Sequence, residues 1–550
     1  MSEWLARFRR LFGNDQKIAR RAEVKRVREA THVPGVDPHF EAEALTPAGA
    51  SIIALGQAVR RPDLPVRLDL DALLGRGHGL VLGATNTGKT YLLLLVLAAA
   101  LRRLAFAPDE LGVWVIEHKS ELVPLVREVI AGLVAELPAL EAQVLLDRLV
   151  VIDPFASDAL VPFNLLRPDD GVPAELHAWE VASLVNRVGG SEMGTRQDAF
   201  LFHAILLAIS APKPLTLVEL AMLMDDPVAF LAQAESSPSE RVRSFFRGGL
   251  KVSGSSLDGV RARVTRLLRL PSMRLQLGSK AGLSFPELLA EKIVLVDLGS
   301  PPQGCEDIAR FWSGLVNAKV ARAVFARTHT DAKRPVLVVV DEWAEGLQGE
   351  GDVAGDYEKL LAMARSRGVS MVLAAQSLAG AAKVSSTLPR VVATNCAWQW
   401  WFRASPDDAR LLAHMLPVTG REPRPAGAPW EEAPRSPYLT PAEERDLRVQ
   451  EVSRLPNRTC WYWDRERPYP AVLMRTSSVA LPTPGFRSAE LSARLRNGTL
   501  AKPIKELEAA LAPKVAPVFR ALAKPPAALP PTAPAAPPTV ILRRKRTRRR

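Results

Sequence analysis

The amino-acid sequence predicts an α/β protein with a mostly parallel sheet and an all-helical domain inserted into it. Short runs of branched aliphatic residues alternate with longer helical patterns, as in parallel sheets whose strands are joined by helices. A glycine-containing loop joins one of these strands to a helix. Strand patterns vanish between residues 169 and 285 and return afterwards. Together these observations predict a sheet whose sequence is interrupted by a helical insert.

The composition favours a large cytoplasmic protein with an anionic partner. The chain has 550 residues, enough for two to four domains, and its net charge is +13. Its cysteines are odd in number and far apart in sequence, which fits a reduced compartment; they are Cys305, Cys396 and Cys460. No apolar run reaches the ~18–20 residues that span a bilayer, and no secretory signal is visible. We therefore expect a cytoplasmic protein with at most peripheral contact to the inner face of a bacterial membrane.

The loop at residues 83–90 carries the strongest motif. Its sequence matches the phosphate-binding pattern G-x-x-x-x-G-K-[ST] at every fixed position, between a strand at 79–82 and a helix at 91–101. The glycines let the backbone N–H groups point at phosphate oxygens, and the helix N-terminus adds positive partial charge. Lys89 is predicted to reach the β- and γ-phosphates, and Thr90 to hold Mg²⁺. The expected nucleotide contacts are Gly83, Ala84, Thr85, Asn86, Thr87, Gly88, Lys89, Thr90 and Tyr91.

A second strand supplies the acids that hydrolysis of a bound nucleotide requires. Residues 336–340 form a continuous aliphatic run, which is typical of a strand covered on both faces. The run ends in Asp341-Glu342. We assign Asp341 to the metal and Glu342 to general-base catalysis. ATP and Mg²⁺ are thus the predicted cofactors of an ATP hydrolase.

The order of these patterns divides the chain into five parts. Roughly 250 residues separate Thr90 from Asp341, more than a compact nucleotide-binding sheet needs. The parts are an N-terminal basic and amphipathic helical segment (1–62), a first part of the core (63–168), an all-α inserted domain (169–285), a second part of the core (286–475) and a C-terminal extension (476–550).

Further strands are predicted in both parts of the core. They lie at 112–116, 149–153, 292–298, 369–375 and 397–402, and a last one at 460–463 resembles an edge strand. The strand at 112–116 leads into the charged cluster Glu117–Glu121, which is placed either near the nucleotide, near a subunit boundary, or in a solvated loop. The strand at 369–375 ends at Gln376, whose amide is suited to contact a γ-phosphate or to orient water.

Three basic or amphipathic segments have alternative interpretations. Residues 2–13 fit either a foot on a membrane surface or a helix packed on protein. The insert carries a basic cluster that fits either a phosphate-contacting face or a solvated surface; it comprises Arg241, Arg243, Arg247, Lys251, Arg261, Arg263, Arg266 and Arg269. Residues 524–539 are rich in Pro and Ala and precede Arg543–Arg550, a tail that either binds DNA or an acidic partner, or has no partner.

The combined motifs resemble a known family. Beside the loop at 83–90 and the acid-tipped strand at 336–342, residues 364–377 resemble the signature R-x-x-G-(apolar strand)-Q-S. With the helical insert, these features resemble the FtsK/HerA superfamily of ring-forming DNA motors. Within it they are most similar to the coupling-protein ATPases of conjugative, type IV secretion-linked DNA transfer, the TraD/TraG/TrwB group. The resemblance spans residues 75 to 490, and the chain lacks the transmembrane segment that many coupling proteins have.

The resemblance implies a fold and roles for individual residues. It implies a RecA-like P-loop NTPase core in a ring, expected to be a hexamer. Gln376 is then a γ-phosphate sensor. Arg365 is an arginine finger that reaches the neighbouring subunit's nucleotide, with Arg367 as the alternative.

The resulting functional hypothesis is an ATP-driven DNA-translocating motor in conjugative or mobile-element DNA transfer. Its expected partners are DNA, other copies of the chain, and a relaxosome or secretion channel. One alternative is a HerA-like translocase or helicase partnered with a nuclease in repair or defence. The other is a P-loop ATPase that powers protein transport or assembly without DNA.

Overall fold

The computed structural model describes residues 37–46, 49, 51–186, 188, 193–247, 254–299, 301–347, 353–415, 418, 438–467, 471–479 and 488–511. The amphipathic pattern at 2–13, Lys251, the Pro/Ala-rich segment and the arginine tail lie outside these residues.

One 11-stranded sheet organises the chain, in the order β2-β1-β12-β11-β10-β3-β9-β8-β4-β7-β5. Its seven parallel strands are β10 (Cys396–Trp401), β3 (His78–Leu82), β9 (Val369–Ala375), β8 (Val336–Asp341), β4 (Gly112–Glu117), β7 (Ile293–Asp297) and β5 (Leu149–Ile152). Each coincides with a strand predicted from an apolar run, because strands covered on both faces are apolar throughout. The sheet is therefore mostly parallel, as expected.

The other four strands form an antiparallel extension that the sequence prediction largely missed. They are β1 (Ile52–Ala58), β2 (Arg61–Asp69), β11 (Thr459–Asp464) and β12 (Val472–Thr476). Strand β1 lies within the segment 1–62, which is expected to be helical, and strand β2 crosses the end of that segment. Two prolines in β2 and two register shifts between the strands obscure their alternation, so no clean period is visible. The predicted edge strand β11 lies between β10 and β12 and is not an edge.

Helices cover both faces of the parallel part. Alternate strand residues point to opposite faces, so Val113 and Val115 pack with α5 (Lys89–Phe106) and α6 (Leu122–Glu136). Trp114 and Ile116 pack on the other face with α16 (Glu306–Ala326) and α17 (Val353–Ala364). Helices α7 (Ala139–Arg148) and α19 (Leu388–Asn395) extend the first and second layers respectively. The sheet is thus the middle of three layers.

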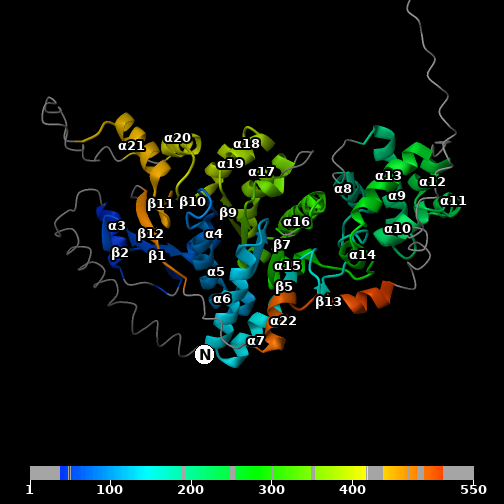
Figure 1. Ribbon diagram of the computed structural model, residues 1–550, viewed down its shortest axis with the longest axis horizontal. Coiled ribbons are helices and arrows are strands. Elements are labelled where there is room, and N and C mark those ends of the chain that lie inside the picture. The colour runs from blue at the N-terminus through cyan, green and yellow to red at the C-terminus, as the bar shows by residue number, and fades with distance from the viewer. Residues whose placement is uncertain are drawn as a thin grey trace, which may run out of the picture.

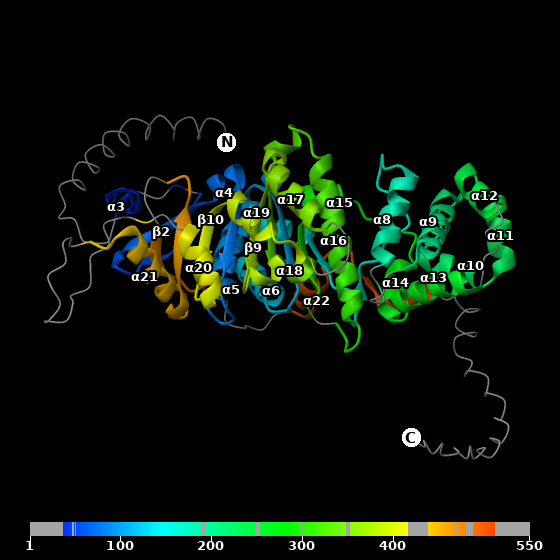
Figure 2. The ribbon, with the colours of Figure 1, turned by 90° about the horizontal axis from the view of Figure 1, so that it is seen from above.

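The inserted segment is helical, as predicted. Every regular element that the structure describes between β6 (Ala159–Leu160) and β7 is a helix. These are α8 (Ala174–Asn186), α9 (Thr195–Ser210), α10 (Leu217–Met224), α11 (Pro227–Glu235), α12 (Glu240–Arg247), α13 (Gly254–Leu267), α14 (Pro271–Leu277) and α15 (Phe285–Glu291). Figures 1 and 2 show α8 to α14 at one end of the molecule and the antiparallel extension at the other.

The remaining elements lie at the periphery. Early in the sequence these are α3 (Pro38–Leu45) and α4 (Leu70–Arg76). Later in the sequence they are α18 (Ala379–Val384), α20 (Pro406–Met415) and α21 (Pro441–Arg454). The C-terminal extension contributes α22 (Ala489–Asn497), β13 (Lys502–Pro503) and a helix at 504–511. Gly498 forms a bridge to Val150 of β5, so the extension packs on the core.

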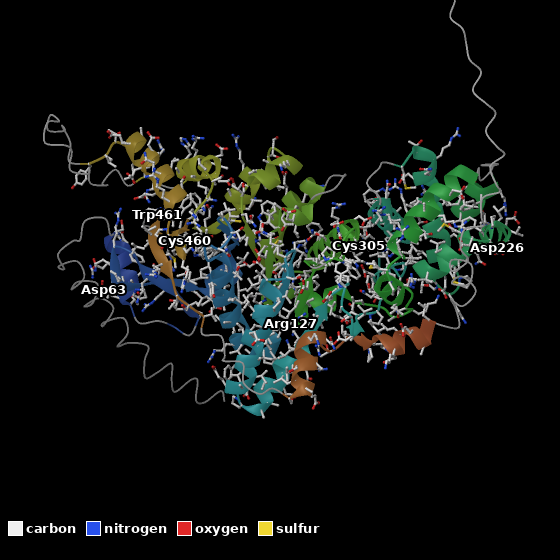
Figure 3. The ribbon with its side chains drawn as sticks, in the orientation of Figure 1. Asp63, Arg127, Asp226, Cys305, Cys460 and Trp461 are labelled. Carbon is white, nitrogen blue, oxygen red and sulfur yellow. The ribbon has the colours of Figure 1, made fainter. Side chains whose placement is uncertain are left out.

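Two further observations concern the cysteines and the helices. All three cysteines are free thiols, and Figure 3 places Cys305 and Cys460 in different parts of the molecule. Across the described ranges, no helix combines the length and apolar character needed to cross a membrane.

Candidate nucleotide site at the carboxyl ends of the strands

The glycine loop is anchored between the two strands that flank β3. The Gly83 N–H donates to the Ala375 carbonyl at the end of β9 over 3.2 Å, and the Ala84 N–H donates to the Arg403 carbonyl after β10 over 2.7 Å. The Thr87 hydroxyl closes the loop by donating to the Ala84 carbonyl over 2.7 Å. The loop therefore has a fixed place at the carboxyl edge of the sheet, where α/β proteins bind ligands.

Both glycines of the motif are required by close packing. A Cβ atom at Gly83 would lie 2.5 Å from the Cβ of Phe402, which no side chain tolerates. Gly88 has φ +110°, a backbone conformation that L side chains rarely adopt, and a Cβ there would lie 3.1 Å from the Cα of Arg458. The spacing seen in the sequence thus has a steric cause in this fold.

Lys89 is buried and is held by the loop itself. Its ammonium group donates to the carbonyls of Gly83 over 2.6 Å and Ala84 over 3.1 Å. Burial lowers the pKa of Lys89, which the carboxylates of Glu342 and Asp341 oppose. The amine is therefore held by neutral backbone oxygens of the loop.

Asp341 and Glu342 lie beside the loop because β9 pairs with both β3 and β8. Leu82 is in register with Ala375, and Asp341 with Ala374. Burial, and then the charge of Glu342, raise the pKa of Asp341 to about 6. Glu342 is also buried and adopts φ +52°, a conformation that persists in non-glycine residues only when the surroundings impose it.

Lys119 is the residue of this site that sequence reasoning did not assign. It lies two residues after the end of β4, the neighbour of β8, and its ammonium group lies 2.8 Å from Oε1 of Glu342. Proximity to the nucleotide is one of the three interpretations of the cluster Glu117–Glu121. The ion pair supports that interpretation for Lys119, whose charge partly offsets the two buried acids.

The neighbours of Lys119 have structural contacts. The carboxylate of Glu117 accepts hydrogen bonds from the N–H groups of Glu121, Leu122 and Val123, and so caps the start of α6. Burial raises the pKa of Glu117 to about 7. His118 contacts the Asp341 carbonyl over 3.1 Å and the Ser313 hydroxyl over 3.0 Å, which ties β4 to β8 and α16.

Gln376 and Arg365 lie at opposite ends of β9. Gln376 directly follows Ala375, the residue whose carbonyl holds Gly83, so it is adjacent to the loop. Arg365 lies in the 3₁₀ turn Arg365–Arg367 before the strand, and β9 spans about 23 Å. Arg365 therefore lies far from the phosphate loop of its own chain.

Arg365 lines a cavity of about 400 Å³ at the amino ends of the strands, together with His78 and Arg465. The alternative finger, Arg367, donates to the Arg327 carbonyl, and its own carbonyl accepts from Arg327 Nε over 2.8 Å. Arg367 is thus used within the chain, whereas Arg365 has an exposed side chain.

Three of the basic residues of the insert contact neighbouring elements of the fold. Arg261 pairs with Asp225 over 2.6 Å, and Arg266 pairs with Asp307 over 2.5 Å. Arg263 donates to the carbonyls of Asn186 and Val188. These three arginines connect helices, so they favour the structural interpretation over a phosphate-contacting face.

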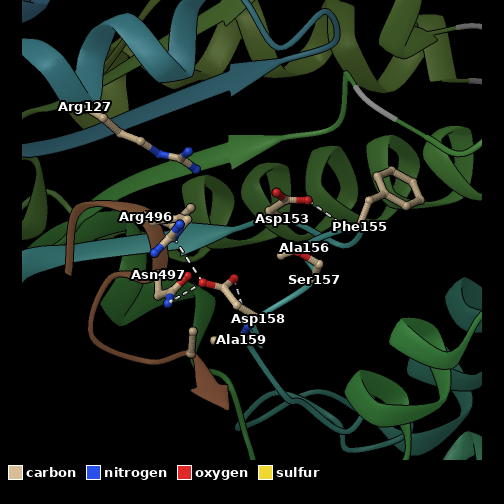
Figure 4. Close-up of a pocket in the computed structure, with 11 residues that line it drawn as sticks. Arg127, Asp153, Phe155, Ala156, Ser157, Asp158, Ala159, Arg496 and Asn497 are labelled. Atoms are coloured by element: carbon tan, nitrogen blue, oxygen red, sulfur yellow. Dashed lines mark hydrogen bonds and ion pairs between the residues drawn. The ribbon is translucent and has the colours of Figure 1, made fainter. Parts of the chain in front are cut away.

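Another cavity, of about 240 Å³, lies beyond the end of β5. Figure 4 shows Arg127 and Asp153 at this cavity, with Arg496 directed at Asp158, 3.1 Å away. Four strands separate β5 from β3 in the sheet. The cavity is therefore distinct from the nucleotide loop.

The sheet topology and the glycine loop at the carboxyl ends of its strands define a P-loop NTPase fold. Solved structures of other proteins share this fold. No protein-family model matches the chain, and no curated protein matches it. The bacterial conjugative coupling protein TrwB, in the unbound form TrwBdeltaN70, superposes with a TM-score of 0.51 at 14% identity, covering 81% of this chain and 94% of that chain.

Two further neighbours have similar coverage. TrwB in complex with the non-hydrolysable ATP analogue ADPNP gives a TM-score of 0.50 at 15% identity, covering 82% of this chain and 94% of that one. VirB4 of Thermoanaerobacter pseudethanolicus gives 0.48 at 10% identity, covering 79% and 98%. The chain thus has the fold of TrwB, which confirms the predicted P-loop NTPase core with its inserted helices.

The Lys119–Glu342 ion pair yields a first prediction. Lys119→Met leaves Glu342 buried without its counter-charge, so the melting temperature of the nucleotide-free chain should fall. In a Glu342→Gln background the same change should cost less, with a coupling of about 0.5–3 kcal/mol between the two sites. Thermal unfolding of the four variants measures this coupling, and strictly additive effects would show that the pair contributes nothing.

Proposed function

We propose that this protein is an Mg-ATP-hydrolysing motor that translocates DNA as a ring, expected to be hexameric, in conjugative or mobile-element DNA transfer. One observation carries the proposal. The phosphate loop, Gln376 and the pair Asp341–Glu342 lie at the carboxyl ends of three adjacent strands, β3, β9 and β8. This arrangement suits hydrolysis of a nucleoside triphosphate, and the fold is that of a coupling protein.

The residues at this edge fit ATP and Mg²⁺. Lys89 donates to loop carbonyls at the place where phosphate oxygens are expected, so a triphosphate would exchange weak acceptors for strong ones. Thr90 and Asp341 offer the hydroxyl and carboxylate oxygens that Mg²⁺ prefers. When bound, the metal would neutralise charge on the phosphates. TrwB, whose fold this chain shares, has been solved with an ATP analogue.

The chain's own residues divide the remaining work. Glu342 follows Asp341 at the tip of β8 and is the candidate general base for the attacking water. The ammonium group of Lys119 pairs with one carboxylate oxygen of Glu342 and thereby orients the other oxygen. Gln376, at the next strand tip, is positioned to contact a γ-phosphate or water.

The proposed DNA substrate is supported by the charge of the chain, and the proposed ring is supported by its fold. The chain carries a net charge of +13, which favours a polyanionic partner. Its neighbour TrwB is a conjugative coupling protein. A relaxosome or secretion channel is then the expected partner, whereas a HerA-like motor would work with a nuclease.

DNA-stimulated hydrolysis tests the proposed function. The full chain should hydrolyse Mg-ATP faster with duplex or single-stranded DNA than without, and Lys89→Ala should show neither rate. Hydrolysis that DNA does not stimulate would favour a motor for protein transport or assembly. No hydrolysis by the wild-type chain would contradict the proposal.

Two substitutions in the site should fail differently. Lys89→Ala should weaken ATP binding as well as turnover, because it removes contacts to the ground-state phosphates. Glu342→Gln should retain ATP binding while turnover is lost, because only the base is missing. Equilibrium binding and single-turnover hydrolysis separate the two effects. Normal hydrolysis by Glu342→Gln would transfer the base assignment to Glu345.

Arg365 should act only on a neighbouring subunit, because about 23 Å of β9 separates it from its own loop. Arg365→Ala should leave ATP binding intact and reduce turnover by ~10³-fold or more. Mixing Arg365→Ala with Lys89→Ala subunits should restore part of the activity, because some interfaces then combine two intact halves. No recovery in rings verified to be mixed would count against a finger that acts on the neighbouring subunit.

A further inference from the structure

The order of the strands gives a nucleotide in this site a direction. Strands β9 and β8, with Gln376 and Glu342 at their tips, lie on one side of β3. Strands β10 and β11 lie on its other side. If the γ-phosphate faces Glu342, as the proposed function requires, the nucleoside extends from the loop towards β10 and β11. The residues that meet it must therefore come from the start of α5 and from the loops around those strands.

The segment before β11 is fixed against the phosphate loop on that side. The Arg458 N–H donates to the Thr87 carbonyl over 2.7 Å, and the Arg458 carbonyl accepts from the Thr476 N–H over 2.8 Å. Gly88 packs directly against the Cα of Arg458. The two hydrogen bonds involve the backbone of Arg458, so they hold the segment beside the phosphate loop whatever side chain stands at this position.

The Arg458 side chain is directed from this segment towards the beginning of α5. Its Nη2 donates to the Thr476 carbonyl over 2.8 Å, and its guanidinium carbon lies 5.5 Å from the centre of the Tyr91 ring. Its Nε is inaccessible to solvent and has no hydrogen-bond partner in the structure. Arg458 also adopts φ +66°. Backbone strain and an unpaired buried donor of this kind collect at functional sites.

Tyr91 completes the surface. It follows Thr90, the last residue of the phosphate motif, and it is 40% exposed although α5 is otherwise mostly buried at this end. A planar ring and a guanidinium at the exit of a phosphate loop offer stacking and cation–π contacts to an aromatic base.

We propose that Tyr91 and Arg458 form the nucleobase subsite of this nucleotide site. The proposal rests on the proposed function, because it takes the nucleotide and its direction from there. The ligand is a planar base, held by stacking on Tyr91 and by the guanidinium of Arg458. Stacking accepts every base, so the subsite contributes affinity for nucleotides over bare polyphosphate rather than a choice of one base.

Comparison of a nucleotide with a ligand that lacks the base isolates this contribution. ADPNP and tripolyphosphate are titrated into the full-length chain with Mg²⁺ by calorimetry. Arg458→Asn removes the guanidinium and keeps a residue type that tolerates positive φ. Tyr91→Leu removes the ring, and Phe106→Leu, at the exposed far end of α5, is the matched control.

The subsite predicts a selective loss. Arg458→Asn and Tyr91→Leu should each weaken ADPNP binding about 5- to 100-fold, the range for one stacked base, and leave tripolyphosphate binding within about twofold. Phe106→Leu should change neither. Equal weakening of both ligands would show that the two residues only shape the phosphate loop, and unchanged ADPNP binding would place the base elsewhere. Either result overturns the subsite alone. Wild-type chain that binds neither ligand would overturn the proposed function as well.

Discussion

The parallel register of β3, β9 and β8 is the constraint on which the candidate site depends. β9 accepts the Gly83 N–H at its last residue and pairs Ala374 with Asp341, so it fixes the distance between the loop and the acids. Burial on both faces holds this register, because its apolar side chains alternate between two helical layers. A shift of β9 by one residue against β3, with β8 following, would move Asp341 and Gln376 away from the loop together.

Four buried or half-buried charges share this edge and largely cancel. Lys119 binds Glu342, while Lys89 turns to neutral carbonyls and lies near both acids. These charged groups are paired within the chain, so they must exchange partners when a polyanion such as a triphosphate binds. The left-handed conformation of Glu342 fits this view, because backbone strain of this kind collects at functional sites.

The sequence predicts the parallel strands and the phosphate loop well, for a physical reason. A strand buried on both faces is an unbroken aliphatic run, and a loop that wraps phosphate needs glycine at fixed places. The antiparallel strands β1 and β2 were missed because prolines and two register shifts hide their period. Lys119 was not assigned because its partner, Glu342, lies more than 200 residues away in sequence. Arg458 was not assigned because its place beside the loop comes from a backbone contact to Thr87.

The central claim is that one nucleotide site forms across β3, β9 and β8 with its γ-phosphate towards Glu342. The most direct measurement is an experimental structure of the chain with ADPNP and Mg²⁺. The account predicts the triphosphate in the loop at residues 83–90, with the Lys89 amine transferred from the Gly83 and Ala84 carbonyls to phosphate oxygens. A nucleotide bound away from this loop, or a bound triphosphate that leaves Lys89 on those carbonyls, would contradict it.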